Sequence, residues 1–249
     1  MTTSHDWSFR LVPLTDTPAL NLAPQSSRMV SAYEDRAGRC HIISDVLDHD
    51  RQTPFNILAS WDARLEYWVS SDYQRFQRAA VVAERGTWTG DPAKSDTDCV
   101  GVASPGILVA SNRLWVYYAS RGPRCPMGPF QLRGEMGPDA LDTLPGRIEA
   151  ASAPLNSDGS PSGPFSTDGI MVDLAQSAES MRLDDPCAVL HDAHIWLFFK
   201  SVGYPNQVGD RTITVMLATA PEHSPAGPFT VNPTPVRPTA ARSNSYCGT

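Results

Sequence analysis

Two adjacent carboxylates, Asp184 and Asp185, stand before a proline in the segment Arg182-Leu183-Asp184-Asp185-Pro186-Cys187. Proline fixes its own φ and favours extended geometry at the residue before it, so we expect Asp185 to point from the start of a β-strand into a site. Since successive side chains of a strand point to opposite faces, Asp184 should point the other way. Neighbouring carboxyl groups can do acid–base chemistry when their environments separate their pKa values. The alternative is an aspartate that caps a turn before a strand.

Residues that commonly bind metals or form disulfides are scattered. Histidines His41, His191 and His194 are too dispersed to indicate a metal site. The cysteine count is odd and no two cysteines form a Cys-x-x-Cys pair, so neither a zinc site, a redox motif nor a disulfide framework is predicted. The five positions are Cys40, Cys99, Cys125, Cys187 and Cys247. We therefore expect no metal and no cofactor.

Composition excludes several classes of function. The 249 residues carry a formal net charge of −7 and show no basic patch, so the sequence does not indicate nucleic-acid binding. The segment Met1–Arg10 has no apolar core of a secretory signal, and no apolar run is long enough to cross a membrane. We expect a reduced, cytoplasmic protein that does not bind membranes. The 22 prolines and 17 glycines favour many short elements joined by turns over a few long helices.

Three segments share the pattern of a β-hairpin, in which an apolar run, a polar turn and an aromatic or β-branched run follow one another. They are residues 29–44, 104–120 and 185–201. In the second and third, the interval from proline to serine is the same, Pro105 to Ser120 and Pro186 to Ser201. Asn112, in the second turn, suits the left-handed backbone that tight hairpins need.

Each hairpin is followed by a second repeated pattern. A predicted third strand, residues 147–153 or 212–220, leads to a Ser-Pro-x-Gly-Pro-Phe loop at Ser160–Phe165 or Ser224–Phe229 and then to an outer strand. In the first repeat the expected counterpart is Phe55–Trp61, with the pattern ending near Trp68. Four antiparallel strands per repeat are typical of a propeller blade. A β-sandwich is the alternative.

Over roughly Ser26 to Val231, these motifs resemble the five-bladed β-propeller glycoside hydrolases of families 43 and 117 and their relatives among the invertases and β-mannoside phosphorylases. The resemblance implies an all-β, five-bladed propeller, with an incomplete last blade, as a single domain over residues 1–249. The expected divisions are an N-terminal segment (1–24), blade regions at 25–90, 100–165 and 184–231, and an irregular tail (232–249).

In that superfamily, an aspartate of the first blade acts as base or nucleophile, an aspartate in a mid-chain Asp-Pro motif tunes the acid, and a later glutamate or histidine donates the proton. The resemblance gives Asp185 the acid-tuning role and makes Asp184 a secondary candidate. The first-blade position departs from the pattern, because Gln25-Ser26-Ser27 holds no carboxylate. Neither Asp45 nor Asp48 fits the motif. No Asp, Glu or His follows His223.

The resemblance implies a glycoside hydrolase that acts on a small or terminal sugar. Arg182 and Ser104 are candidate substrate-binding residues, and Trp88 and Trp61, which lie near loops, are candidate platforms for a sugar ring. The alternative is a non-catalytic carbohydrate-binding or structural propeller. A third possibility is a glycoside phosphorylase, which needs Arg121, Arg124 and Arg182 to converge on a phosphate. Unpaired sheet edges would favour a homo-oligomer.

Overall fold

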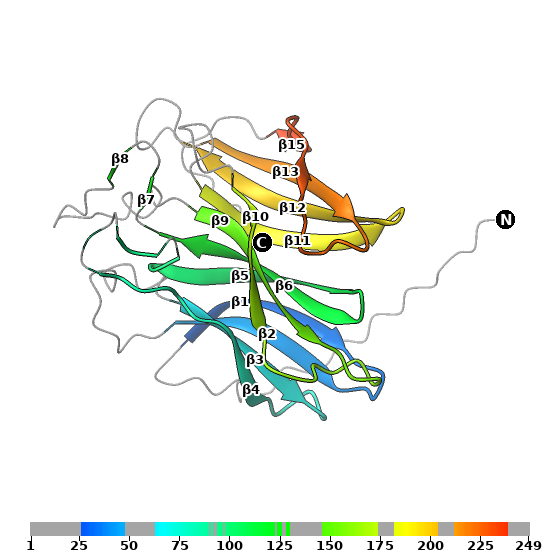
Figure 1. Cartoon of the computed structure of the whole chain (residues 1–249). Helices are drawn as coiled ribbons and strands as arrows, with labels where there is room; N and C mark the ends of the chain where they lie inside the picture. The colour runs from blue at the N-terminus through cyan, green and yellow to red at the C-terminus, as the bar shows by residue number, and fades with distance from the viewer. Residues whose placement is uncertain are drawn as a thin grey trace.

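The computed structural model shows three stacked groups of β-strands (Figure 1). It describes residues 26–47, 63–89, 91, 94–96, 98–122, 124–125, 128–129, 146–173, 182–203 and 212–238. Within these ranges every regular element is a strand, which confirms the all-β prediction. No helix of the described residues is long and apolar enough to cross a membrane.

The first unit is a four-stranded antiparallel sheet with its strands in chain order. Its strands are β1 (Ser26–Glu34), β2 (Cys40–Leu47), β3 (Ala63–Ser70) and β4 (Gln77–Ala83). The third strand of this unit, which pairs with β2 on the side away from β1, is therefore Ala63–Ser70. The segment Phe55–Trp61, which we expected to form the third strand, lies outside the described residues.

The second unit repeats this arrangement, with β5 paired to β6, β6 to β9 and β9 to β10. Its strands are β5 (Gly101–Ala110), β6 (Arg113–Arg121), β9 (Gly146–Pro154) and β10 (Ser166–Val172). The β5–β6 turn has φ of 50° at Ser111 and 56° at Asn112, which confirms the left-handed geometry predicted for Asn112. Between β6 and β9, the short strands β7 (Arg124–Cys125) and β8 (Gly128–Pro129) pair with each other.

The third unit pairs β11 with β12 and β12 with β13 along their whole lengths. Its strands are β11 (Arg182–His191), β12 (His194–Gly203), β13 (Thr212–Pro221), β14 (Thr230–Val231) and β15 (Arg237–Pro238). Both short strands, β14 and β15, pair with β13. Strand β15 lies within the segment that we expected to be an irregular tail.

Two apolar cores hold the units together. One contains Leu65 and Tyr67 of the first unit with Val116 and Tyr118 of the second, and the other contains Trp115 and Tyr117 of the second unit with residues of the third. The second and third units also share one sheet through the pair Arg182–Gly146 of β11 and β9. Three repeats of four-stranded character are therefore present among the described residues, and no described sheet closes on itself.

The first strands of the three units, β1, β5 and β11, are here called the inner strands, because they lie against one another. Ser31 Oγ of β1 donates to the carbonyl oxygen of Pro105 in β5, at 2.6 Å. Gly106 of β5 packs so closely on β11 that a Cβ atom at this position would lie 2.1 Å from the carbonyl oxygen of Pro186. A side chain at Gly106 would therefore push the second and third units apart.

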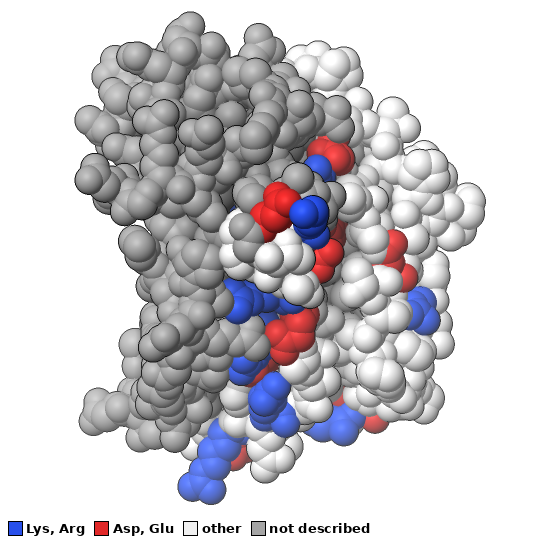
Figure 2. All heavy atoms as spheres, turned by 60° about the vertical axis from the view of Figure 1, so that its left-hand side comes forward, with Lys and Arg blue, Asp and Glu red and all other residues white. Residues whose placement is uncertain are grey.

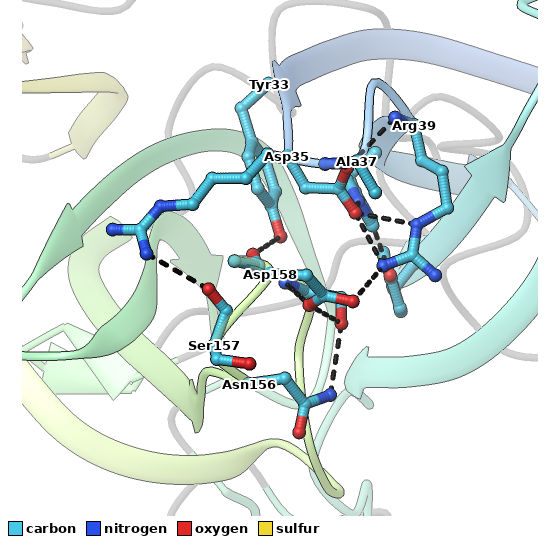
Figure 3. A network of polar contacts seen from close by, with 12 residues as sticks. Tyr33, Asp35, Ala37, Arg39, Asn156, Ser157 and Asp158 are labelled. Carbon is cyan, nitrogen blue, oxygen red and sulfur yellow. Dashed lines mark hydrogen bonds and ion pairs between the residues drawn. The ribbon is translucent and has the colours of Figure 1, made fainter.

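At the far end of the inner strands, the β1–β2 turn is fastened to the second unit by a polar network (Figure 3). The carboxylate of Asp35 accepts bonds from the amides of Ala37 and Arg39 and from Arg39 Nε. His41 Nε2 lies 2.9 Å from the same carboxylate, and Arg39 Nη2 lies 2.7 Å from Asp158 of the β9–β10 loop. This network joins side chains of two units and buries Asp35 almost completely.

Candidate active site

Matching bulges interrupt two inner strands close to where those strands begin. The pairing of β5 with β6 shifts between Ala103 and Gly106, and the pairing of β11 with β12 shifts between Asp184 and Cys187. The bulged residues Ser104 and Asp185 have φ of 55° and 49°. Left-handed backbone at residues other than glycine is strained, and bulges of this kind often re-aim a side chain next to a site.

The bulge corrects one detail of the sequence interpretation. We expected Pro186 to hold Asp185 in extended geometry, whereas Asp185 is left-handed. The bulge turns Asp185 towards solvent and leaves Asp184 2% exposed in the interior. The two carboxylates differ in burial, but both contact Lys200, so they do not lie on opposite faces as alternation along a regular strand predicted.

Cations from two units surround the carboxylate of Asp184. Arg121 Nη2, at the end of β6, lies 2.7 Å from its Oδ1, while Arg182 Nε and Lys200 Nζ lie 3.5 and 3.8 Å from its Oδ2. Ser104 Oγ donates to Oδ1 at 3.4 Å, and the amide of Asp185 donates to it at 3.2 Å. Asp184 therefore links the bulges of β5 and β11.

Electrostatics hold Asp184 in its ionised form. Burial alone would raise the pKa of this carboxyl group, but the charges of Arg121, Arg182 and Lys200 outweigh burial and keep the pKa far below its usual range. Burial likewise lowers the pKa of Arg121, against the opposing effect of Asp184. A carboxyl group held ionised in this way is not a proton donor near neutral pH, and it accepts bonds from the side chains around it.

Asp185 is the accessible member of the pair. Its side chain is 41% exposed, and its Oδ2 lies 2.5 Å from Lys200 Nζ. Lys200 thus bridges the buried Asp184 and the exposed Asp185. Figure 2, turned to bring this end of the molecule forward, shows acidic and basic side chains interleaved in one band. The arrangement presents one carboxylate to solvent on a rigid, charged support.

Gly146, the first residue of β9, makes room for this support. A Cβ atom at Gly146 would lie 2.4 Å from Arg121 Nη1 and 3.0 Å from Arg182 Cγ. Arg121 Nη1 also donates to the carbonyl oxygens of Leu183 and Ser120. The arginine is therefore held on three sides by backbone and carboxylate, which fixes the direction of the bond that it makes to Asp184.

Asp45 supplies a carboxylate at the start of the first unit, which the sequence motif lacks. It lies on β2, is fully buried, and its Oδ1 accepts a bond from the amide of Met29 at 2.8 Å. Met29 lies within the irregular pairing between Ser27 and Val30 of β1. Asp45 therefore orders the irregular stretch of the first inner strand from the neighbouring strand rather than from the inner strand itself.

The structure brings together some of the predicted site residues. Asp184, Asp185, Arg182 and Ser104 meet at the two bulges. Trp88 is half-buried in the connection between β4 and β5 and is not among the groups that hold Asp184. Trp61 and the side chain of Arg124 lie outside the described residues. No group of three or more His, Cys, Asp or Glu among the residues described is arranged to hold a metal ion.

Sequence reasoning missed Lys200 altogether and assigned Arg121 only to a phosphate site. The signal for Lys200 was present, because counting outward from the two-residue turn Asp192–Ala193 puts Lys200 opposite the Asp184–Asp185 pair. No local signal pairs Arg121 with Asp184, since the two belong to different units. Convergence between units becomes visible only in the folded chain.

Comparisons with known proteins find likeness in structure rather than in sequence. No protein-family model matches the chain, and the search of curated proteins finds no match. A family 117 glycoside hydrolase produced by the marine bacterium Zobellia galactanivorans superposes with a TM-score of 0.57 at 20% identity, over 84% of this chain and 56% of that one. A structure described as a glycoside hydrolase gives a TM-score of 0.56 at 11% identity, over 91% and 61%.

A third solved structure, a BT0996 RGII complex, gives a TM-score of 0.54 at 12% identity and covers 91% of this chain. The chain thus spans 56% to 61% of the length of these three solved proteins. At such low identity the likeness concerns the fold alone. At that level it confirms the resemblance inferred from the sequence: the all-β fold of the described residues is similar to that of solved glycoside hydrolases.

Proposed function

We propose that the chain is a glycoside hydrolase that acts on a small or terminal sugar, bound where the inner strands begin. The observation that carries the proposal is Asp185, an exposed carboxylate before Pro186 on a strained bulge. Lys200 contacts both Asp185 and the buried Asp184, and so joins the two carboxylates. Glycosidic cleavage needs carboxyl groups at the scissile bond whose protonation states differ. Asp185 is assigned the acid-tuning role, and Ser104 and Arg182 position it through Asp184.

The three described units would then be consecutive blades of a propeller. The family resemblance implies five blades, and the greater length of the solved relatives leaves room for more blades than three. Inner strands that start at one end of a propeller bring their first residues together around the axis. This arrangement explains why the bulges of β5 and β11 meet at Asp184.

Carbohydrate binding without turnover is the second candidate, and the burial of two carboxylates favours it. Asp45 is 0% exposed and Asp184 is 2% exposed, so neither reaches a bound sugar. Phosphorolysis has less support. Arg121 and Arg182 do converge, but on Asp184, and both are almost fully buried. A phosphate would have to displace a carboxylate that these cations already hold.

The experiment is hydrolysis of aryl arabinoside, xyloside, galactoside and fucoside by the native chain and by Asp185→Asn. The matched control is Asp192→Asn, since Asp192 also has left-handed backbone and is 86% exposed in the turn of the same hairpin. We expect Asp185→Asn to lose at least about 100-fold in kcat/KM and Asp192→Asn to keep the native rate.

Calorimetric titration with the parent sugars separates the two candidates. Binding that Asp185→Asn weakens, without turnover by the folded native chain, would replace the hydrolase with the binding protein. Equal rates for Asp185→Asn and the native chain would remove Asp185 from the site.

A further inference from the structure

A buried carboxyl group lies at the contact between the first and second units. Glu149 of β9 is 6% exposed, and its Oε2 accepts a hydrogen bond from Tyr118 Oη of β6 at 3.4 Å. Tyr118 belongs to the apolar core that the second unit shares with the first. Side chains alternate along a strand, so Ser120 shares this face with Tyr118, whereas Arg121 reaches Asp184 on the other face. Glu149 and the candidate active site therefore lie on opposite sides of the same strand.

A second carboxyl group approaches Glu149 from the connection between β4 and β5. Asp98 is partly buried, and its Oδ1 packs so closely on this connection that a Cβ atom at Gly86 would lie 2.1 Å from it. The amide of Val100 donates to the carbonyl oxygen of Arg121 at 3.0 Å, which holds the connection against the end of β6. The negative charge of Asp98 acts on Glu149. Two carboxyl groups thus share one contact between units.

The two carboxyl groups have no cation bound to them in the described part of the chain. None of the ion pairs between described residues includes Glu149 or Asp98. Arg147, on the same strand as Glu149, acts on it through its charge, but Arg147 Nε lies 2.8 Å from Asp173 of the second unit. The first unit presents apolar side chains at this contact, namely Leu65, Val82 and Ala83. An ionised carboxyl group in such surroundings is costly.

Both carboxyl groups respond to these surroundings in the same direction. Burial raises the pKa of Glu149, and the charge of Asp98 adds to the increase, against opposing effects led by Ser120. Burial also raises the pKa of Asp98, as does the charge of Asp96. The direction is opposite to that at Asp184, where cations prevail. The contact between the first two units therefore favours a bound proton.

An unpaired hydroxyl group lies beside Glu149. Ser120 is 0% exposed, and its Oγ acts on Glu149 but completes no hydrogen bond of good geometry with any described residue. An ionised carboxylate only accepts hydrogen bonds, whereas a protonated carboxyl group also donates one. A proton on Glu149 adds a donor that can bond to Ser120 Oγ or to Asp98, while Tyr118 still donates to Oε2.

We propose that Glu149, Asp98 and Ser120 form a proton-binding site between the first two units, and that release of the proton to solvent loosens their contact. Ionised Glu149 is repelled by Asp98, and water has to enter the contact to solvate the new charge. The inference does not depend on the proposed function, because it needs neither a substrate nor Asp185.

The test is urea denaturation of the native chain and of Glu149→Gln between about pH 4 and about pH 8. The folded-state pKa is raised, so the stability from this group is complete below the unfolded-state pKa of about 4.3 and is lost as pH rises through the folded value. Glutamine imitates the protonated side chain and removes this loss. We expect Glu149→Gln to match the native chain at about pH 4 and to lower the equilibrium constant of unfolding about fivefold or more at about pH 8.

Glu66→Gln is the matched control. Glu66 lies on the third strand of the first unit, as Glu149 lies on the third strand of the second, and it is 1% exposed. Its Oε1, however, lies 2.7 Å from Arg64 Nε and 3.2 Å from Arg78 Nε. Loss of this paired charge should lower stability at about pH 8. If Glu149→Gln destabilises the protein at about pH 8 as Glu66→Gln does, the proposal is overturned.

Amide hydrogen exchange tests the loosening itself. At about pH 8 the amides of β4 and β9 should exchange faster in the native chain than in Glu149→Gln, and those of β12 and β13 at the same rate in both. Equal exchange at the contact overturns the proposal. If Glu149→Gln does not fold, Asp98→Asn replaces it. This variant removes the like charge, so its stability should persist to higher pH than that of the native chain, and an unchanged profile overturns the proposal as well.

Discussion

Asp35 and Asp184 are both buried aspartates at the ends of inner strands, yet their surroundings differ in kind. Asp35 is 6% exposed and satisfied mostly within its own hairpin, by two amides, Arg39 and His41. Asp184 is 2% exposed, and most of the groups that hold it are side-chain cations. The pKa of each carboxyl group lies far below its usual range.

The difference separates a structural network from a candidate site. Around Asp35, one carboxylate and local amides complete a turn and fasten it to the loop that holds Asp158. Around Asp184, three cations face one buried carboxylate, and one of them, Lys200, also contacts the exposed Asp185. Both aspartates have an exposed carboxylate beside them, Glu34 next to Asp35 and Asp185 next to Asp184, but only Asp185 has left-handed backbone. Left-handed backbone beside a buried cluster of charged side chains is the kind of feature from which a functional site is proposed.

The largest expected effect is that of Asp184→Asn. An amide keeps the shape but removes the negative charge that Arg121, Arg182 and Lys200 face at Asp184, so we expect the free energy of unfolding to fall by about 3–5 kcal/mol. Urea denaturation followed by tryptophan fluorescence measures the change. A loss below about 1 kcal/mol would mean that water or another acid already neutralises these arginines.

Asp35→Asn should cost less, about 1–3 kcal/mol, because amides and His41 remain as partners for a neutral side chain. The same denaturation experiment measures the change under identical conditions. The comparison breaks down if Asp35→Asn destabilises the protein more than Asp184→Asn, since the Asp35 network would then be the more heavily charged of the two.

The sequence predicted the local parts of both regions and not their convergence. The hairpins follow from alternating patterns and turn residues such as Asn112. The motif before Pro186 and the family resemblance singled out Asp184 and Asp185 as site candidates, and their roles stay a prediction. The bulge that exchanges their environments was not predictable, because it depends on pairing with β12. The contact of Arg39 with Asp158 joins positions 119 residues apart. No repeating pattern of residues in the sequence predicts such a contact, because it depends on how two units pack.

Gly146→Ala tests whether the support of Asp184 is as rigid as its geometry implies. A methyl group there collides with Arg121, so we expect a loss of about 1–3 kcal/mol from overpacking. Gly163→Ala is the matched control, since a Cβ atom at Gly163 would meet nothing within 4 Å and its φ is not left-handed. The control should leave stability unchanged or slightly raised. Equal effects at the two glycines would show that Arg121 moves freely.

The smallest effect is the dependence of stability on pH. Both folded-state pKa values are depressed, so the stability that these groups contribute is complete above the unfolded-state pKa of about 4 and is lost as pH falls towards the folded values. Between pH 5 and pH 3 each group should account for a loss of about 1 kcal/mol.

Urea denaturation of the native chain, Asp35→Asn and Asp184→Asn across this interval measures the contribution of each carboxyl group. Each variant should flatten the profile by a similar amount despite their unequal losses at neutral pH. A depressed pKa is common to both sites, whereas loss of the charge that faces three cations is particular to Asp184. A profile that Asp184→Asn leaves as steep as the native one would show that the three cations do not hold this carboxylate ionised.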